Sequence, residues 1–65
     1  MKVLLNDEAV EIDERTTVAG LLARLGIEDK GIAVAVDWAV IPRSEWHLPL
    51  SDGAKVDVVT AVQGG

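Results

Sequence analysis

The sequence predicts an α+β fold in which a mixed sheet of about five strands carries one main helix packed on one face. A chain of 65 residues allows a single small domain, and a hydrophobic content of 49% can supply its core. Apolar residues alternate, as in strands, on both sides of one segment that has the periodicity of a helix. Since the chain has no cysteine, packing of this core must stabilise the fold without disulfides.

A β-hairpin is expected at the start of the chain. Apolar and polar residues alternate on both sides of Asn6–Glu8, which has the composition of a turn. The residues predicted to face the core are Met1, Val3, Leu5, Val10 and Ile12.

A helix is expected next. Thr16 or Thr17 can cap its N-terminus, and Gly26 stands where a left-handed glycine commonly ends a helix. Gly20 lies inside the helix and is expected to allow close approach to the sheet. The apolar face of the helix is predicted to consist of Val18, Leu21, Leu22 and Leu25.

Two strands joined by a tight turn follow. Ile32–Val36 is an uninterrupted apolar run, which predicts a strand that is covered on both faces or lies centrally in the sheet. Asp37 and Trp38 form the turn into a short strand, Ala39–Ile41. Pro42 ends this strand because proline cannot donate to a ladder.

The last third of the chain is expected to close the core. Pro42 can open a single helical turn through residues 43–46, with Trp46 folded back as a lid. A turn at Ser51–Gly53 precedes the last strand, residues 55–62. The core residues of that strand are predicted to be Val56 and Val58.

The predicted element order, β-β-α-β-β-β, is that of the β-grasp, or ubiquitin-like, architecture, in which one amphipathic helix lies across a curled sheet. We expect the β-grasp domain to span residues 1–62 and residues 63–65 to form a flexible C-terminal diglycine tail.

The charge of the chain argues against several classes of function. Eleven acidic and six basic residues give a net charge of −5, whereas nucleic acids and anionic membranes recruit clustered basic residues. The longest apolar run, residues 32–36, is too short to span a membrane, and too few apolar residues follow Lys2 for a signal peptide. We therefore expect a soluble cytoplasmic protein that binds neither nucleic acid nor membrane.

The residues of common active sites are also missing. The sequence has no phosphate-loop, dinucleotide, zinc-hydrolase or serine-hydrolase motif. His47 is the only histidine, and the adjacent Asp13 and Glu14 fit a solvated acidic rim better than an acid–base pair. We expect no metal site, no bound cofactor and no enzymatic activity.

The most specific feature is the diglycine that closes the sequence, Gly64 and Gly65. Without Cβ atoms, both residues can thread a narrow channel and adopt positive φ angles. They would present the α-carboxylate of Gly65, a poor electrophile that must be activated, typically as an acyl-adenylate. ATP, Mg²⁺ and the stabilisation of phosphate must then belong to a partner.

Other segments carry a family resemblance beside the diglycine. These segments are Ala33–Val36, Pro42–Trp46, Asp52–Gly53 and Thr60–Gly65. They resemble the ThiS family, the sulfur carrier proteins of thiamine biosynthesis, over essentially the whole chain. The sequence departs from the family pattern at Gly20, Asp37 and Ala54.

The resemblance implies a cycle of sulfur transfer at Gly65. An adenylating enzyme of the ThiF type, related to ubiquitin E1 proteins, would activate the carboxylate with ATP. A persulfide donor such as a cysteine desulfurase would convert it to a thiocarboxylate, and thiazole synthase of the ThiG type would accept the sulfur. Gln63 would belong to the recognised tail together with Gly64.

Partners are expected to dock on the outer face of the sheet. If Val56 and Val58 point inward, the parity of the strands turns the other side chains away from the helix. Leu4, Val59 and Ala61 are therefore predicted to form a small exposed apolar patch that leads to the tail. The net charge of −5 predicts basic grooves on the partners.

Three alternatives share parts of this pattern. The small subunit of molybdopterin synthase has the same fold, diglycine and thiocarboxylate, although that family tends to be longer and to carry aromatic residues, and this chain has no Phe or Tyr. A ubiquitin-like modifier would form isopeptide adducts on lysines of other proteins. A passive interaction module would tolerate deletion of the diglycine.

Overall fold

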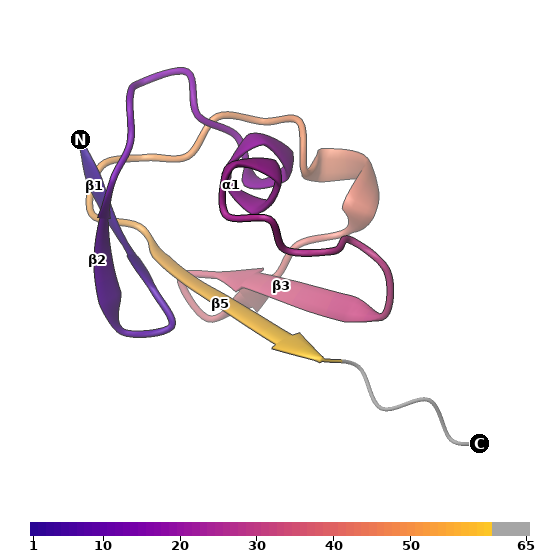
Figure 1. Cartoon of the computed structure of the whole chain (residues 1–65). Helices are drawn as coiled ribbons and strands as arrows, with labels where there is room; N and C mark the ends of the chain where they lie inside the picture. The colour runs from indigo at the N-terminus through magenta and orange to yellow at the C-terminus, as the bar shows by residue number, and fades with distance from the viewer. Residues whose placement is uncertain (61–65) are drawn as a thin grey trace.

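The computed structural model describes residues 1–60, which form a five-stranded sheet with one helix against one face (Figure 1). This arrangement and the order of its elements confirm the prediction from the sequence. The elements are β1 (Lys2–Leu5), β2 (Glu8–Glu11), α1 (Val18–Arg24), β3 (Ile32–Val36), β4 (Ala39–Val40), the 3₁₀ turn η1 (Arg43–Glu45) and β5 (Lys55–Thr60).

Strand β5, the last strand within residues 1–60, is the central strand of the sheet, whose order is β2-β1-β5-β3-β4. Strand β5 pairs parallel with β1 on one side and antiparallel with β3 on the other. The two hairpins, β1–β2 and β3–β4, therefore meet only through β5. The predicted end of this strand, at Val62, lies outside the described residues.

Both hairpins turn through two residues with positive φ angles. Asn6 and Asp7 join β1 to β2 with φ angles of 48° and 67°, and Asp37 and Trp38 join β3 to β4 with 51° and 73°. Two-residue loops with this geometry are type I′ turns, whose twist matches that of the flanking strands. Glu8, which the sequence assigned to the first turn, instead begins β2.

The side chain of Asn6 lengthens the pairing between β1 and β5. Its Oδ1 accepts a hydrogen bond from the Val58 amide at 2.9 Å, and its Nδ2 donates to the Val58 carbonyl at 3.3 Å. The Asn6 amide also donates to the carbonyl of Val56 at 2.9 Å. An asparagine amide thus takes the place of a strand backbone where β1 has already turned away.

Helix α1 begins and ends at the predicted signals. The Thr17 Oγ1 accepts a hydrogen bond from the Gly20 amide at 3.0 Å, and Gly26 has a φ angle of +70° just beyond the last turn. Leu25 does not face the core as predicted: it lies past the helix end and is 42% exposed. Gly20 is exposed beside Thr17 rather than close to the sheet, so the expected role in helix–sheet packing is wrong.

The core lies between α1 and the inner face of the sheet. Met1 is exposed, contrary to prediction, because β1 begins only at Lys2. Trp46 follows η1 as predicted and covers the core at 6% exposure, with its Nε1 donating to the Ile41 carbonyl at 3.2 Å. The most completely buried side chains are Val3, Leu21, Val34 and Val56.

Leu21 and Leu25 test which face of the helix stabilises the fold. Leu21→Ala should lower the free energy of unfolding by about 2–5 kcal/mol, because it removes buried methyl groups and leaves a cavity. Leu25→Ala should cost less than about 1 kcal/mol, since that side chain is largely exposed. Urea denaturation followed by circular dichroism measures both values, and equal losses would contradict this orientation of the helix.

Candidate functional site

The candidate site is the outer face of the sheet, along the strand that leads to the diglycine. Strand β5 reaches Thr60, the last residue that the structure describes (Figure 1). The proposed site residues Ala61, Gln63, Gly64 and Gly65 lie outside the described residues. What the structure describes is the strand that precedes them in the sequence and the sheet around it.

The alternation of β5 places its side chains as the sequence predicted. Val56 is buried and Val58 packs against the core, while Val59 is 57% exposed on the outer face. Leu4 is exposed as well, at 42%. However, Leu4 lies beside Lys55 in the parallel register, which places it about 13 Å from Val59 along the strand. The expected single patch of Leu4 with Val59 is therefore divided.

Strands β3 and β4 add apolar residues to the outer face that sequence reasoning missed. Ala33 is the register partner of Val59, and Ala35 is the partner of the exposed Val40. The run Ile32–Val36 was expected to be covered on both faces or to lie centrally. It lies inside the sheet, but its two alanines remain partly exposed on the face opposite the helix. The alternation of large and small residues within the run was the available signal.

Lys55 organises the polar part of this face. Its Nζ lies 3.1 Å from Asp7 Oδ1 and 3.3 Å from Asp57 Oδ1, and 4.8 Å from the ring centroid of Trp38. Its backbone amide donates to Asp37 Oδ1 at 3.0 Å. Residues from the tips of both hairpins are thus tied to the first residue of the central strand.

The same contacts perturb the titration of the lysine. The hydrogen bond to Asp7 raises the pKa of the Lys55 ammonium above its ordinary value, and Asp57 acts in the same direction. Partial desolvation of the ammonium opposes this rise in the pKa. The charged form of Lys55 is therefore the form that the folded state favours.

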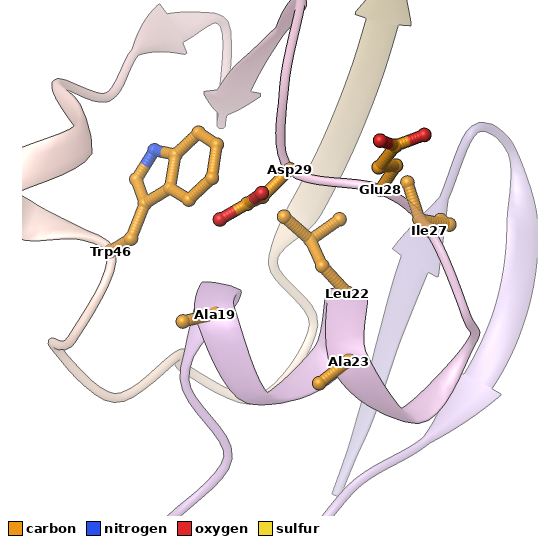
Figure 2. A pocket seen from close by; sticks show the side chains of 7 residues that line it. All are labelled: Ala19, Leu22, Ala23, Ile27, Glu28, Asp29 and Trp46. Atoms are coloured by element: carbon orange, nitrogen blue, oxygen red, sulfur yellow. The ribbon is translucent and has the colours of Figure 1, made fainter.

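A pocket lies on the other side of the molecule, between α1 and Trp46 (Figure 2). It has a volume of ≈ 240 Å³ and is open to solvent. Arg43 braces one wall, since it stacks on Trp46 and pairs with Asp29 at 3.3 Å. The lining residues are Ala19, Leu22, Ala23, Ile27, Glu28, Asp29 and Trp46. These side chains include two carboxylates but no nucleophile or histidine, so the pocket does not resemble a catalytic centre.

In the described part of the chain, the other candidate catalytic or metal-binding side chains either have a structural role or have no second functional group beside them. Asp13 shapes the turn before the helix, because its Oδ1 accepts from the Arg15 amide at 2.8 Å and from the Thr16 hydroxyl at 3.3 Å. His47 is exposed. Within residues 1–60, no three His, Cys, Asp or Glu side chains gather in a way that could hold a metal ion. No helix in this part of the chain is long and apolar enough to cross a membrane.

Comparison of the sequence with known proteins finds one family match and two relatives. The profile of the ThiS family matches residues 3–65. The chain is 31% identical over 67 residues to the sulfur carrier protein ThiS of Escherichia coli (strain K12), and the match covers all of both chains. It is also 30% identical over 66 residues to a thiazole synthase of Paramagnetospirillum magneticum, of whose length it spans only 20%.

Comparison with solved structures supports the same fold. The crystal structure of a thiamine biosynthesis protein (ThiS) from Geobacter metallireducens matches all of both chains with a TM-score of 0.83, at 23% sequence identity. The predicted β-grasp, ubiquitin-like fold is thereby confirmed.

The perturbed lysine gives a test of the outer-face cluster. Asp7→Asn should lower the pKa of Lys55, because it removes the strongest acceptor of the ammonium hydrogen bond. A group whose pKa is raised by folding stabilises the protein fully below its unfolded pKa, about 10.4 for lysine, and this stabilisation is lost as the pH rises through the folded value. NMR titration of the Lys55 side chain in both proteins measures the two midpoints, and coincident midpoints would show that Asp7 does not hold the ammonium.

Proposed function

The chain belongs to the ThiS family and is a sulfur carrier of thiamine biosynthesis, and on that premise we propose that it carries sulfur on the carboxylate of Gly65. The observation that carries this proposal is the extent of the family match, which runs over residues 3–65 and so includes Gly64 and Gly65. As a carrier, the chain is not an enzyme and binds no cofactor of its own.

The chemistry at Gly65 requires activation from outside the chain. The carboxylate attacks the α-phosphate of ATP, and pyrophosphate leaves to give an acyl-adenylate. The terminal sulfur of a persulfide then attacks the acyl carbon and AMP leaves. A thiol cleaves the resulting acyl disulfide, which yields the thiocarboxylate and a new disulfide. The positive charge that stabilises the phosphates belongs to the adenylating enzyme and its Mg²⁺.

Three partners follow from this chemistry: an adenylating enzyme of the ThiF type, a persulfide donor such as a cysteine desulfurase, and a thiazole synthase of the ThiG type. The thiazole synthase of Paramagnetospirillum magneticum supports the last of these, because it contains a region similar to this whole chain. Two functions joined in one polypeptide work at high effective concentration, so we infer that carrier and synthase act together here too. We place the cycle in the cytoplasm, where ATP is available.

The surface that these partners contact is the outer face of the sheet. Val59 is exposed one residue before the end of β5, and Ala33 extends the apolar surface beside it. Leu4 lies further along the same face. Ala61, Gln63 and the diglycine follow Thr60 in the sequence, so we infer that the partner that covers this face also contacts these residues. The net charge of −5 favours partners with basic surfaces.

The position of the sulfur can be tested by intact mass spectrometry. After incubation with the adenylating enzyme, ATP and a persulfide source, the chain should gain the mass of one oxygen-to-sulfur exchange, located at Gly65 by fragmentation. A variant extended by one alanine beyond Gly65 should remain unchanged. Sulfur on the extended variant, or at another residue of the natural chain, would refute the proposal. Growth of a deletion strain on medium without thiamine tests the pathway itself.

The docking surface can be tested at Val59. Val59→Asp should raise the KM for the carrier in ATP–pyrophosphate exchange about tenfold, because a carboxylate replaces an apolar contact worth roughly 1.4 kcal/mol. The variant should melt within a few degrees of the natural protein, since the side chain is mainly exposed. Leu4→Asp is the matched comparison, and its effect reports how far the interface extends. Unchanged kinetics for Val59→Asp would remove this face from the interface.

A further inference from the structure

Trp38 is the least buried large apolar residue among residues 1–60. It is 82% exposed, whereas the other tryptophan, Trp46, is only 6% exposed. The docking surface predicted from the sequence did not include Trp38. A tryptophan buries a large apolar area when it meets a partner, which is why this residue is enriched among the anchors of protein interfaces.

The backbone conformation of Trp38 disfavours a large side chain at this position. It holds the second position of a type I′ turn with a φ angle of +73°. This position favours glycine, because a Cβ atom is strained at positive φ. Glycine at this position would make the turn more stable. Neither the geometry of the turn nor the packing of the core therefore explains an indole here.

The indole is nevertheless oriented. The Lys55 Nζ lies 4.8 Å from the centroid of the ring, and Asp7 and Asp57 hold this ammonium in place. The Asp37 carboxylate anchors the same turn by accepting a hydrogen bond from the Lys55 amide. A side chain that is held while exposed loses little conformational entropy when a partner binds it.

Trp38 also lies at one end of a continuous apolar strip. Within the β3–β4 hairpin it is followed by the exposed Val40, whose partner across the hairpin is Ala35. Ala33 and its partner Val59 continue the strip to the end of β5. The turn and the strand that leads to the diglycine therefore belong to one surface.

The charges around Trp38 indicate the chemistry of the occupant. Asp7 and Asp57 contact the ammonium of Lys55, and Asp37 accepts a hydrogen bond from its backbone amide. With three carboxylates and one ammonium, the cluster carries a net negative charge. A complementary partner has an apolar recess for an indole, bordered by basic side chains. An enzyme that binds ATP carries basic side chains for its phosphates, so the adenylating partner is expected to present positive charge that complements this cluster.

We propose that Trp38 is the anchor by which the adenylating partner holds this carrier, with the indole inserted into an apolar recess that has a basic rim. The inference rests on the proposed function, because it assigns the contact to the enzyme that activates Gly65. It adds a contact at the opposite end of β5 from the reacting carboxylate. The partner then contacts the carrier at two points, Trp38 and the diglycine.

Trp38→Gly separates recognition from folding. The KM for the carrier in ATP–pyrophosphate exchange should rise about 10- to 30-fold, as for a binding hot spot. The rate at saturating carrier should be unchanged, and the melting temperature should be equal to or above that of the natural protein. Trp38→Phe, which keeps an aromatic ring at the same φ angle, should restore the KM to within about threefold. The matched control, Leu25→Ala, removes an exposed apolar side chain from the helix side and should leave the KM unchanged.

An unchanged KM for Trp38→Gly would overturn the proposal. A raised KM together with a lowered melting temperature and no recovery in Trp38→Phe would also overturn it, because those results describe a structural residue. If the natural chain supports no exchange at all, the proposed function fails. That failure is seen without any variant and is therefore distinguishable from failure of the anchor.

A direct reading comes from ¹⁹F NMR of the full chain labelled with 5-fluorotryptophan. The chain has two tryptophans, so addition of the unlabelled adenylating enzyme should shift and broaden the Trp38 signal and leave that of Trp46 in place. A shift of the Trp38 signal on raising the carrier concentration alone would assign the surface to a second copy of the chain. A shift with thiazole synthase but not with the adenylating enzyme would assign it to the synthase. Either result would overturn the proposal.

Discussion

The pairing of β5 with both of its neighbours is the constraint on which the rest of the structure depends. Each hairpin is a two-stranded unit that is at best marginally stable alone, and in the part of the chain that the structure describes only β5 pairs with both of them. The side chain of Asn6 adds two further hydrogen bonds to this pairing through Val58. Because β5 is also the last strand within residues 1–60, the segment that precedes the diglycine in the sequence is the segment that closes the sheet. Loss of this pairing would therefore remove the fold and the strand that precedes the diglycine together.

Much of the fold could be predicted because its signals are local. The cap at Thr17, the glycine stop at Gly26 and the lid formed by Trp46 each depend on a few neighbouring residues. The prediction that Leu25 faces the core was wrong because the helical periodicity of the sequence continues after the helix has ended. The prediction that Met1 faces the core was wrong because the alternation of apolar residues begins in the sequence one residue before β1 begins.

The candidate site was less predictable, because it depends on which strands are neighbours. Parity alone gave the exposure of Leu4 and Val59, but only the register of β1 on β5 shows how far apart they lie. The contact of Lys55 with Asp7 joins residues that are 48 positions apart in the sequence, so no local pattern predicts it. The role proposed for the diglycine, in contrast, rests on residue type and on the family match rather than on the structure.

The outer face combines apolar exposure with charges that are already paired. Bringing an isolated ammonium into an interface costs free energy unless an opposite charge meets it with good geometry. Lys55 arrives with Asp7 and Asp57 in contact, so a partner that covers this face does not have to supply that compensation. The same ammonium lies under the ring of Trp38 and fixes one apolar side chain in place. The contacts of Lys55 that tie the two hairpin turns to the central strand therefore also orient the indole of Trp38, so the charged side chains that contribute to the fold prepare the surface for binding.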